Sequence, residues 1–256
     1  DVYRAPLEPT DFVGAPDAAR RGINAWVEER TNDKIRELIP PGSIDGNTRL
    51  VLVNAVYFLA EWDVSFDPNS TRDAPFHGPE GEREVPTMHQ TERFGYAEVD
   101  GVRLLDMPYR GEELSMLVVL PEENDGLPAL EAQLSAARLA GWTEALSERR
   151  VRVALPKFRL EPAESMALGG SLAALGVRRV FDANAADLSG MAAPGQRRLA
   201  LSAVYHDAFI AVDEEGTEAA AATAGVIAVT SAEISPEEPV EFIADHPFLF
   251  FLRDRA

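Results

Sequence analysis

The sequence contains no cysteine and no apolar run long enough to span a membrane. Without thiols, a disulfide scaffold, a cysteine nucleophile and a thiolate metal site are excluded, and the cellular compartment stays open. The longest apolar runs, at residues 50–60 and 248–252, have the length of β-strands. Cations are also scarce: 24 Lys and Arg against 43 Asp and Glu give a net charge of -19. We therefore expect neither a nucleic acid nor an anionic membrane as partner.

Patterns that carry enzyme chemistry are scarce as well. None of the four histidines has the two-ligand spacing of a metal-binding helix: His77, His89, His206 and His246. No glycine-rich phosphate loop follows a predicted strand, and Ser189 lies outside any Gly-x-Ser-x-Gly turn. We expect no metal, no cofactor and no enzymatic activity.

The first third of the chain predicts a helix followed by a central strand. Apolar residues at spacings of three and four predict an amphipathic helix over residues 17–39, with a break near Thr31-Asn32. Pro40-Pro41 ends it. The nearly continuous apolar run Thr48–Trp62 predicts a strand that is buried on both faces, in the middle of a sheet.

The remainder is dominated by strand patterns. Short strand signals alternate with turns from Asp67 to Pro121, and Asp100-Gly101 predicts a hairpin. Helices are predicted at residues 127–149 and 164–177, and further strands at residues 150–161, 197–216 and 241–254. No repeat or low-complexity linker divides the chain. We predict a single α+β domain over residues 1–256.

One stretch, DEEGTEAAAATAGVIAVTS at residues 213–231, fits two structures. By propensity it is an alanine-rich helix with Thr217 as a cap after Gly216. Read with a period of two, it is a strand with small side chains on both faces, able to enter a crowded sheet without overpacking it. A chain that leaves its sheet through Gly216 could fold back as an antiparallel strand beside its parent strand.

Seven segments, in order along essentially the whole chain, resemble signatures of the serpin family. They are NAVYFLAEW (54–62), VPTMHQ (85–90), MPYRGEELSMLVVLP (107–121), LPKFRLE (155–161), FDANAADLSGM (181–191), DEEGTEAAAATA (213–224) and ADHPFLFFLRD (244–254). The resemblance implies a large, mostly antiparallel central sheet with flanking helices, a second sheet in a barrel-like C-terminal core, and an exposed reactive loop.

The resemblance also implies suicide-substrate inhibition of serine proteases. A protease attacks the loop and forms an acyl-enzyme. The cleaved loop then inserts between the strand that contains Asn54 and the strand that contains His206, and the distorted protease cannot deacylate. The uncut state is thereby implied to be metastable.

Site residues carry over from the family pattern one by one. The implied loop hinge comprises Glu214, Glu215, Gly216, Thr217, Glu218, Ala219, Ala220, Ala221 and Ala222. Its small side chains favour inhibition over mere family membership. Asn54 and His206 match a pair that hydrogen-bonds across the middle of the main sheet. Trp62 matches a tryptophan at the loop entrance, and Lys157 and Glu214 match an ion pair beside it.

The position of the scissile bond differs with the direction of counting. Counting forward from Glu214 by the usual hinge length gives Thr230–Ser231, whereas counting back from DHPF gives Pro236–Glu237. We favour Thr230–Ser231, because insertion geometry constrains the hinge side and proteases cleave poorly after proline.

The loop composition restricts the target. No Lys or Arg occurs between Ala219 and Phe242, which excludes the cation that a trypsin-like pocket requires. Val229 and Thr230 suit elastase- or subtilisin-like proteases, with chymotrypsin-like enzymes also considered. Glu233 would matter only for a glutamate-specific protease.

Several expectations concern the protein as a whole. The resemblance implies an extracellular monomer that forms a covalent acyl complex with a serine protease. The chain is expected to be truncated at both ends, without N-terminal helices and a last C-terminal strand, and to come from a bacterium. If it were the whole molecule, we would expect poor folding and no inhibition.

The alternative function is a non-inhibitory serpin, a binding or storage module that is cleaved without trapping protease. An unrecognised hydrolase is a third hypothesis.

Overall fold

The computed structural model describes residues 8–191, 199–217 and 238–255. The chain divides into two compact units, each built from segments that are distant in the sequence: Asp1–Tyr57 with Leu160–Ile210, and Phe58–Arg159 with Ala211–Ala256. Helices and strands occur in both units, which confirms the predicted α+β class. Among the described residues, no helix has the length and apolar character needed to cross a membrane.

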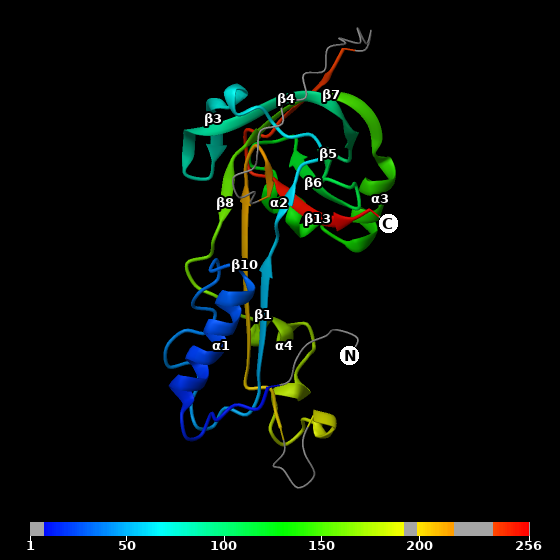
Figure 1. The fold of residues 1–256 in the computed structure, drawn as a ribbon. Coiled ribbons are helices and arrows are strands. Elements are labelled where there is room, and N and C mark those ends of the chain that lie inside the picture. Colours follow the sequence, from blue (N-terminus) through cyan, green and yellow to red (C-terminus); the bar gives the residue numbers. More distant parts are fainter. Residues whose placement is uncertain (1–7, 192–198, 218–237, 256) are drawn as a thin grey trace. The chain divides into compact units, whose positions relative to one another are not determined.

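Figure 1 labels most of the elements. The first unit contains α1 (Pro16–Arg30), β1 (Val51–Tyr57), β9 (Met166–Ala167), α4 (Gly169–Ala174), the 3-10 turns η2 (Arg179–Phe181) and η3 (Ser189–Met191), and most of β10 (Ala203–Val212). The second contains β2 (Ala60–Glu61), η1 (Pro68–Ser70), β3 (Arg72–Gly78), β4 (Gly81–Val99), β5 (Val102–Pro108), β6 (Leu114–Pro121), α2 (Leu127–Ala132), α3 (Ala136–Ala145), β7 (Ser147–Pro156), β11 (Gly216–Thr217), β12 (Val240–Ile243) and β13 (Leu249–Asp254). The short strand β8 (Phe158–Leu160) lies at the boundary between the units in the sequence.

Helix α1 ends at Arg30, so the prediction of a helix to residue 39 is wrong. Asn32 and Asp33 adopt positive φ angles of 48° and 62°, which a right-handed helix cannot contain. The hydroxyl of Thr31 donates to the carbonyl of Val27 and accepts from the amide of Ile35, so it satisfies backbone groups at the helix end. The apolar spacing continues past the end of the helix because Ile35, Leu38 and Ile39 are buried by a non-helical segment that packs back.

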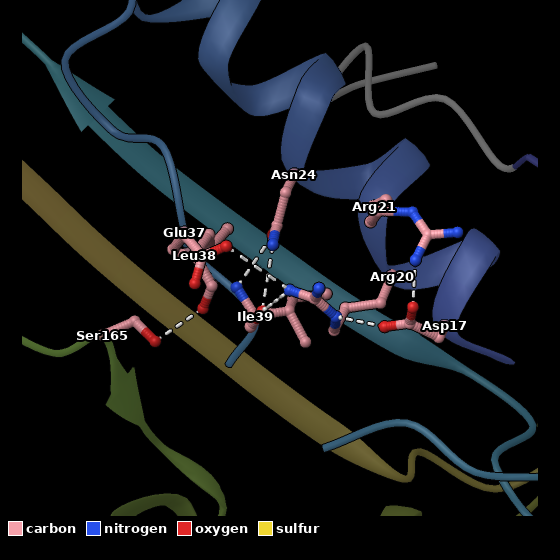
Figure 2. Close-up of polar contacts among 8 residues, drawn as sticks. All are labelled: Asp17, Arg20, Arg21, Asn24, Glu37, Leu38, Ile39 and Ser165. Carbon is pink, nitrogen blue, oxygen red and sulfur yellow. Dashed lines mark hydrogen bonds and ion pairs between the residues drawn. The ribbon is translucent and has the colours of Figure 1, made fainter. Parts of the chain in front are cut away.

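Two buried side chains of α1 hold that returning segment. Figure 2 shows Arg20 and Asn24 pointing from α1 toward Ile39. The Asn24 amide donates to the Ile39 carbonyl at 3.0 Å and accepts from the Ile39 amide at 2.9 Å. The Arg20 guanidinium donates to the same carbonyl at 3.1 Å, and the Ser165 hydroxyl donates to the Leu38 carbonyl at 2.5 Å. Side chains therefore supply the hydrogen bonds that the backbone of Leu38 and Ile39 would otherwise make within a helix.

Strands β1 and β10 run parallel and pair along the whole of β1, with Asn54 opposite His206 (Figure 1). Strand β9 pairs with β10 in the antiparallel direction. The prediction that β1 is buried on both faces is wrong, since its residues Leu52 and Val56 are 51% and 43% exposed. Nothing in the described part of the chain covers that face, although the residues remain apolar as in a strand covered on both sides.

A seven-stranded sheet forms the core of the second unit, with β12-β7-β4-β5-β6-β13 in order and β3 added to β4. The predicted hairpin is confirmed, since Asp100 and Gly101 turn β4 into β5 with positive φ angles of 51° and 75°. The helix predicted at residues 127–149 is two helices instead. Ser135 interrupts it by capping α3 through the amide of Arg138, and α3 ends before β7 begins.

Candidate functional site

The start of the predicted loop hinge contacts a group of side chains in the second unit. We call this group the hinge cluster; it comprises Trp62, Tyr109, Lys157, Glu214 and Thr217. They come from four segments that are far apart in the sequence, with Glu214 and Thr217 in the same one. Four of the five are buried, and each makes a polar or ring contact within the group or with the hinge backbone.

The first two residues past Glu215 already form a strand in the uncut chain. Strand β11 pairs antiparallel with β2, placing Gly216 opposite Glu61, and with the end of β10, placing Thr217 opposite Val212. The predicted return of the chain beside its own parent strand is therefore present at Thr217, and the residues after it lie outside the described part of the chain. It differs from expectation in one respect: Gly216 and Thr217 lie in the sheet without any cleavage, because a tight turn at Asp213 directs them there.

Gly216 permits a very close approach of β11 to β2. A Cβ atom at this position would lie 2.1 Å from the carbonyl oxygen of Ala60 and 2.7 Å from the Cα of Glu61. Backbone atoms cannot yield as a flexible side chain can, so only glycine fits without moving one of the two strands.

Glu214 is anchored through both its side chain and its backbone. Its carboxylate accepts from the Lys157 ammonium at 2.6 Å and from the Thr71 hydroxyl at 2.7 Å, and its carbonyl accepts from the Phe66 amide at 2.8 Å. Burial by itself would raise the pKa of Glu214, but the hydrogen bonds from Lys157 and Thr71 outweigh it and lower the pKa below its ordinary value. The ion pair implied by the family resemblance is present.

Trp62 and Tyr109 pack against the hinge as a stacked pair. Their ring centroids are 4.7 Å apart with an angle of 7° between the planes. The Trp62 indole N–H donates to the Asp213 carbonyl at 2.9 Å, and the Tyr109 and Thr217 hydroxyls lie 2.6 Å apart. Sequence reasoning named Trp62 but missed Tyr109 and Thr71. The only signal for Tyr109 was its place in MPYRGEELSMLVVLP, before a glycine turn.

The other predicted pair lies in the first unit. The Nδ1 atom of His206 is 2.8 Å from the Oδ1 atom of Asn54, and the two residues are register partners of the parallel strands β10 and β1. The bond therefore joins the two strands between which the loop is predicted to insert. Its side chains lie on the same exposed face as Leu52 and Val56.

The remaining predicted positions lie outside the described residues. They are the hinge residues Glu218, Ala219, Ala220, Ala221 and Ala222, and both alternative scissile bonds, Thr230–Ser231 and Pro236–Glu237. Their roles stay predictions.

Comparisons with known proteins agree with the geometry. The family model described as "Serpin (serine protease inhibitor)" matches residues 1–256. The chain belongs to the serpin family. Human leukocyte elastase inhibitor is 45% identical to this serpin over 264 residues, which cover 100% of the chain and 68% of the relative. The bovine leukocyte elastase inhibitor is 47% identical over 264 residues, with the same coverage of 100% and 68%.

Solved serpin structures share the fold. Uncleaved ovalbumin superposes with a TM-score of 0.83 at 34% identity, covering 99% of this serpin and 63% of ovalbumin. Native protease nexin-1 with heparin gives a TM-score of 0.83 at 32% identity, covering 99% and 66%. The chain thus spans about two thirds of the length of these relatives. The family is one of protease inhibitors and not of enzymes. The elastase inhibitors named here are mammalian and do not support the expected bacterial source.

Proposed function

We propose that this serpin inhibits serine proteases by inserting its cleaved reactive loop into the sheet that contains β1 and β10. The observation that carries the proposal is β11. The hinge has already begun to form a strand between β2 and the end of β10, and it does so through Gly216 and a fully buried Thr217. After Glu218, four successive alanines with small side chains follow in the sequence, from Ala219 to Ala222.

The trap has an identifiable energy source. A strand inserted between β1 and β10 replaces one parallel ladder, which spans Val51–Tyr57, with two antiparallel ones. Each added backbone hydrogen bond contributes about 1 kcal/mol net. Over a dozen residues this gain suffices to make insertion effectively irreversible while the acyl bond to the protease still exists.

The proposed target is an elastase- or subtilisin-like serine protease, with a covalent acyl complex as the product. The absence of Lys and Arg between Ala219 and Phe242 argues against trypsin-like enzymes. Val229 and Thr230 present small side chains to a shallow pocket. Relatives covering the whole of this chain are named as inhibitors of a leukocyte elastase, which supports the same class. The monomeric state and the extracellular location stay predictions.

Incubation of the protein with elastase, subtilisin and chymotrypsin tests the proposal. We expect an SDS-stable band at the summed mass, and mass spectrometry of the released loop should place the cut at Thr230–Ser231. Quantitative cleavage with undiminished protease activity would instead show a non-inhibitory serpin.

A substitution at the hinge separates trapping from simple binding. Thr217→Arg should abolish the SDS-stable band while the loop is still cleaved, because a cation would have to be buried at a position with no exposed surface. Thr217→Ser keeps the hydroxyl and the small size, so it should trap protease as the parent protein does. Trapping by the arginine variant would contradict the hinge assignment.

A further inference from the structure

A buried pair of hydroxyl groups joins the hinge to the body of the second unit. The Tyr109 and Thr217 oxygens are 2.6 Å apart, and either atom can donate. Tyr109 is 1% exposed and Thr217 is 0% exposed, so water cannot take the place of either partner. If Thr217 left the sheet, the Tyr109 hydroxyl would remain buried without this partner, which carries the full desolvation cost of the group.

The Tyr109 ring has contacts of its own besides the bond to Thr217. It stacks on Trp62, and the Phe58 ring meets its edge at a centroid distance of 5.1 Å. Its amide donates to the Leu114 carbonyl at 2.9 Å. Burial raises the pKa of the Tyr109 phenol, more than the hydrogen bond with Thr217 lowers it, so the phenol keeps its proton at physiological pH. The Tyr109 hydroxyl is thus held in a defined position, where it can bind the hydroxyl of Thr217.

Outside its strand pairing, Gly216 is held by the turn at Asp213, whose amide donates to the Gly216 carbonyl at 2.9 Å and whose carboxylate accepts from the Gly216 amide at 3.3 Å. Thr217 pairs through its backbone with β2 and β10, and among the described residues its side chain hydrogen-bonds to Tyr109 alone. The pairing itself covers a single position on β10 and two on β2. A strand this short is marginal by its ladder alone, so the hydroxyl pair contributes a large share of what holds it.

We propose that Tyr109 is a positioning residue that keeps Gly216 and Thr217 in the sheet of the uncut protein, so that loop insertion extends an existing strand end. The role in trapping rests on the proposed inhibitory function. With these residues already ordered, insertion begins without first recapturing the hinge, and it competes better with deacylation of the acyl-enzyme. Without the hydroxyl pair the hinge spends more time outside the sheet, and more of the protein is cleaved as a plain substrate.

Hydrogen exchange measures the hinge position without any protease. In Tyr109→Phe, which keeps the ring but loses the hydroxyl, the peptide that carries Gly216 and Thr217 should exchange about fivefold faster than in the parent protein. Thr217→Val removes the partner hydroxyl at nearly constant size and should give the same result, and Thr217→Ser should restore slow exchange. Tyr96→Phe is the matched control, since it removes a hydroxyl bonded to Glu98 elsewhere in the same unit.

The outcomes separate this proposal from the proposed function. Unchanged hinge exchange in both Tyr109→Phe and Thr217→Val overturns the positioning role, whether or not the protein inhibits anything. Equal acceleration in Tyr96→Phe also overturns it, as a general loosening. Faster exchange together with an unchanged stoichiometry of inhibition overturns the role in trapping. A parent protein that forms no SDS-stable complex refutes the inhibitory function. The hydrogen-exchange result then still decides whether Tyr109 keeps Gly216 and Thr217 in the sheet.

Discussion

The hinge cluster and the β1–β10 pairing both contain polar side-chain contacts, but these contacts are buried in the first and exposed in the second. In the hinge cluster Glu214 and Thr217 are buried, and their side chains bond to Lys157, Thr71 and Tyr109. On β1 and β10 the side-chain bond between Asn54 and His206 lies on an exposed face. The apolar residues that flank Asn54 along β1 are about half exposed as well.

Burial sets what each contact contributes. A hydrogen bond closed off from water is costly to break, because its partners cannot be solvated in turn, whereas an exposed bond exchanges for water at little cost. The hinge is therefore held firmly where the strand starts. The parallel strands that would separate in the proposed insertion are joined by a backbone ladder and, at Asn54 and His206, by one exposed side-chain bond. This distribution suits a sheet that must open at one place and guide a strand at another.

Removal of the buried Trp62 ring should have the largest effect on stability of the substitutions considered. Trp62→Ala should lower the free energy of unfolding by about 3–5 kcal/mol, because the ring is 1% exposed and leaves a cavity beside Tyr109. Trp26→Ala is the matched control: this ring on α1 is 38% exposed, and its loss should cost well under half as much. Urea denaturation of both variants measures the difference. Equal losses would show that burial does not set the cost of removing a ring at these two positions.

Much of the hinge cluster follows from the sequence, and the rest depends on tertiary contacts that no pattern encodes. Outside the cluster, the Asp100-Gly101 hairpin is predictable because two residues with positive φ require such a pair. Trp62, Lys157 and Glu214 came from the family resemblance. Tyr109 could not be predicted, since it meets Thr217 across 108 positions and any hydroxyl could have served.

The end of α1 shows how periodicity alone can mislead. The apolar spacing that predicts a helix to residue 39 reports which side chains are buried, and Ile35 and Ile39 are buried as expected. It does not report the backbone. Asn24 supplies hydrogen bonds to both backbone groups of Ile39, so the segment can be buried without being helical.

A methyl group at Gly216 should have the next largest effect. In Gly216→Ala the Cβ atom would collide with the backbone of Ala60, so β11 must shift, and we expect a loss of about 1–3 kcal/mol in the free energy of unfolding. In the control Gly170→Ala the new Cβ meets nothing within 4 Å and lies in α4, so stability should rise by about 0.5–1 kcal/mol. Thermal denaturation should move in opposite directions for the two variants, and a gain at residue 216 would contradict the close approach.

The Glu214 ion pair should show a smaller effect that depends on pH. Because the folded pKa of Glu214 is lowered from 4.5, the contribution to stability is complete above pH 4.5 and is lost as the pH falls through the lowered folded pKa. Glu214→Gln should cost about 1 kcal/mol at pH 7, and this difference from the parent protein should shrink toward pH 3. The control Glu241→Gln removes a pair with Arg152 that is more than half exposed on both sides, so it should change little at either pH. Urea midpoints at several pH values measure both, and a difference that grows in acid would contradict the assignment.

The Asn54–His206 pair should have the smallest effect on stability. A double-mutant cycle of Asn54→Ala and His206→Ala should give a coupling of about 0.5 kcal/mol or less, because the 2.8 Å bond lies on an exposed face where water replaces either partner. The same cycle on Tyr109→Phe and Thr217→Val should give a coupling at least twice as large, since that bond is buried. Equal couplings would mean that the parallel strands are fastened by their side chains as firmly as the hinge is. The opening of the sheet could then no longer be explained by a weak side-chain bond between β1 and β10, and the barrier would have to lie in the backbone ladder itself.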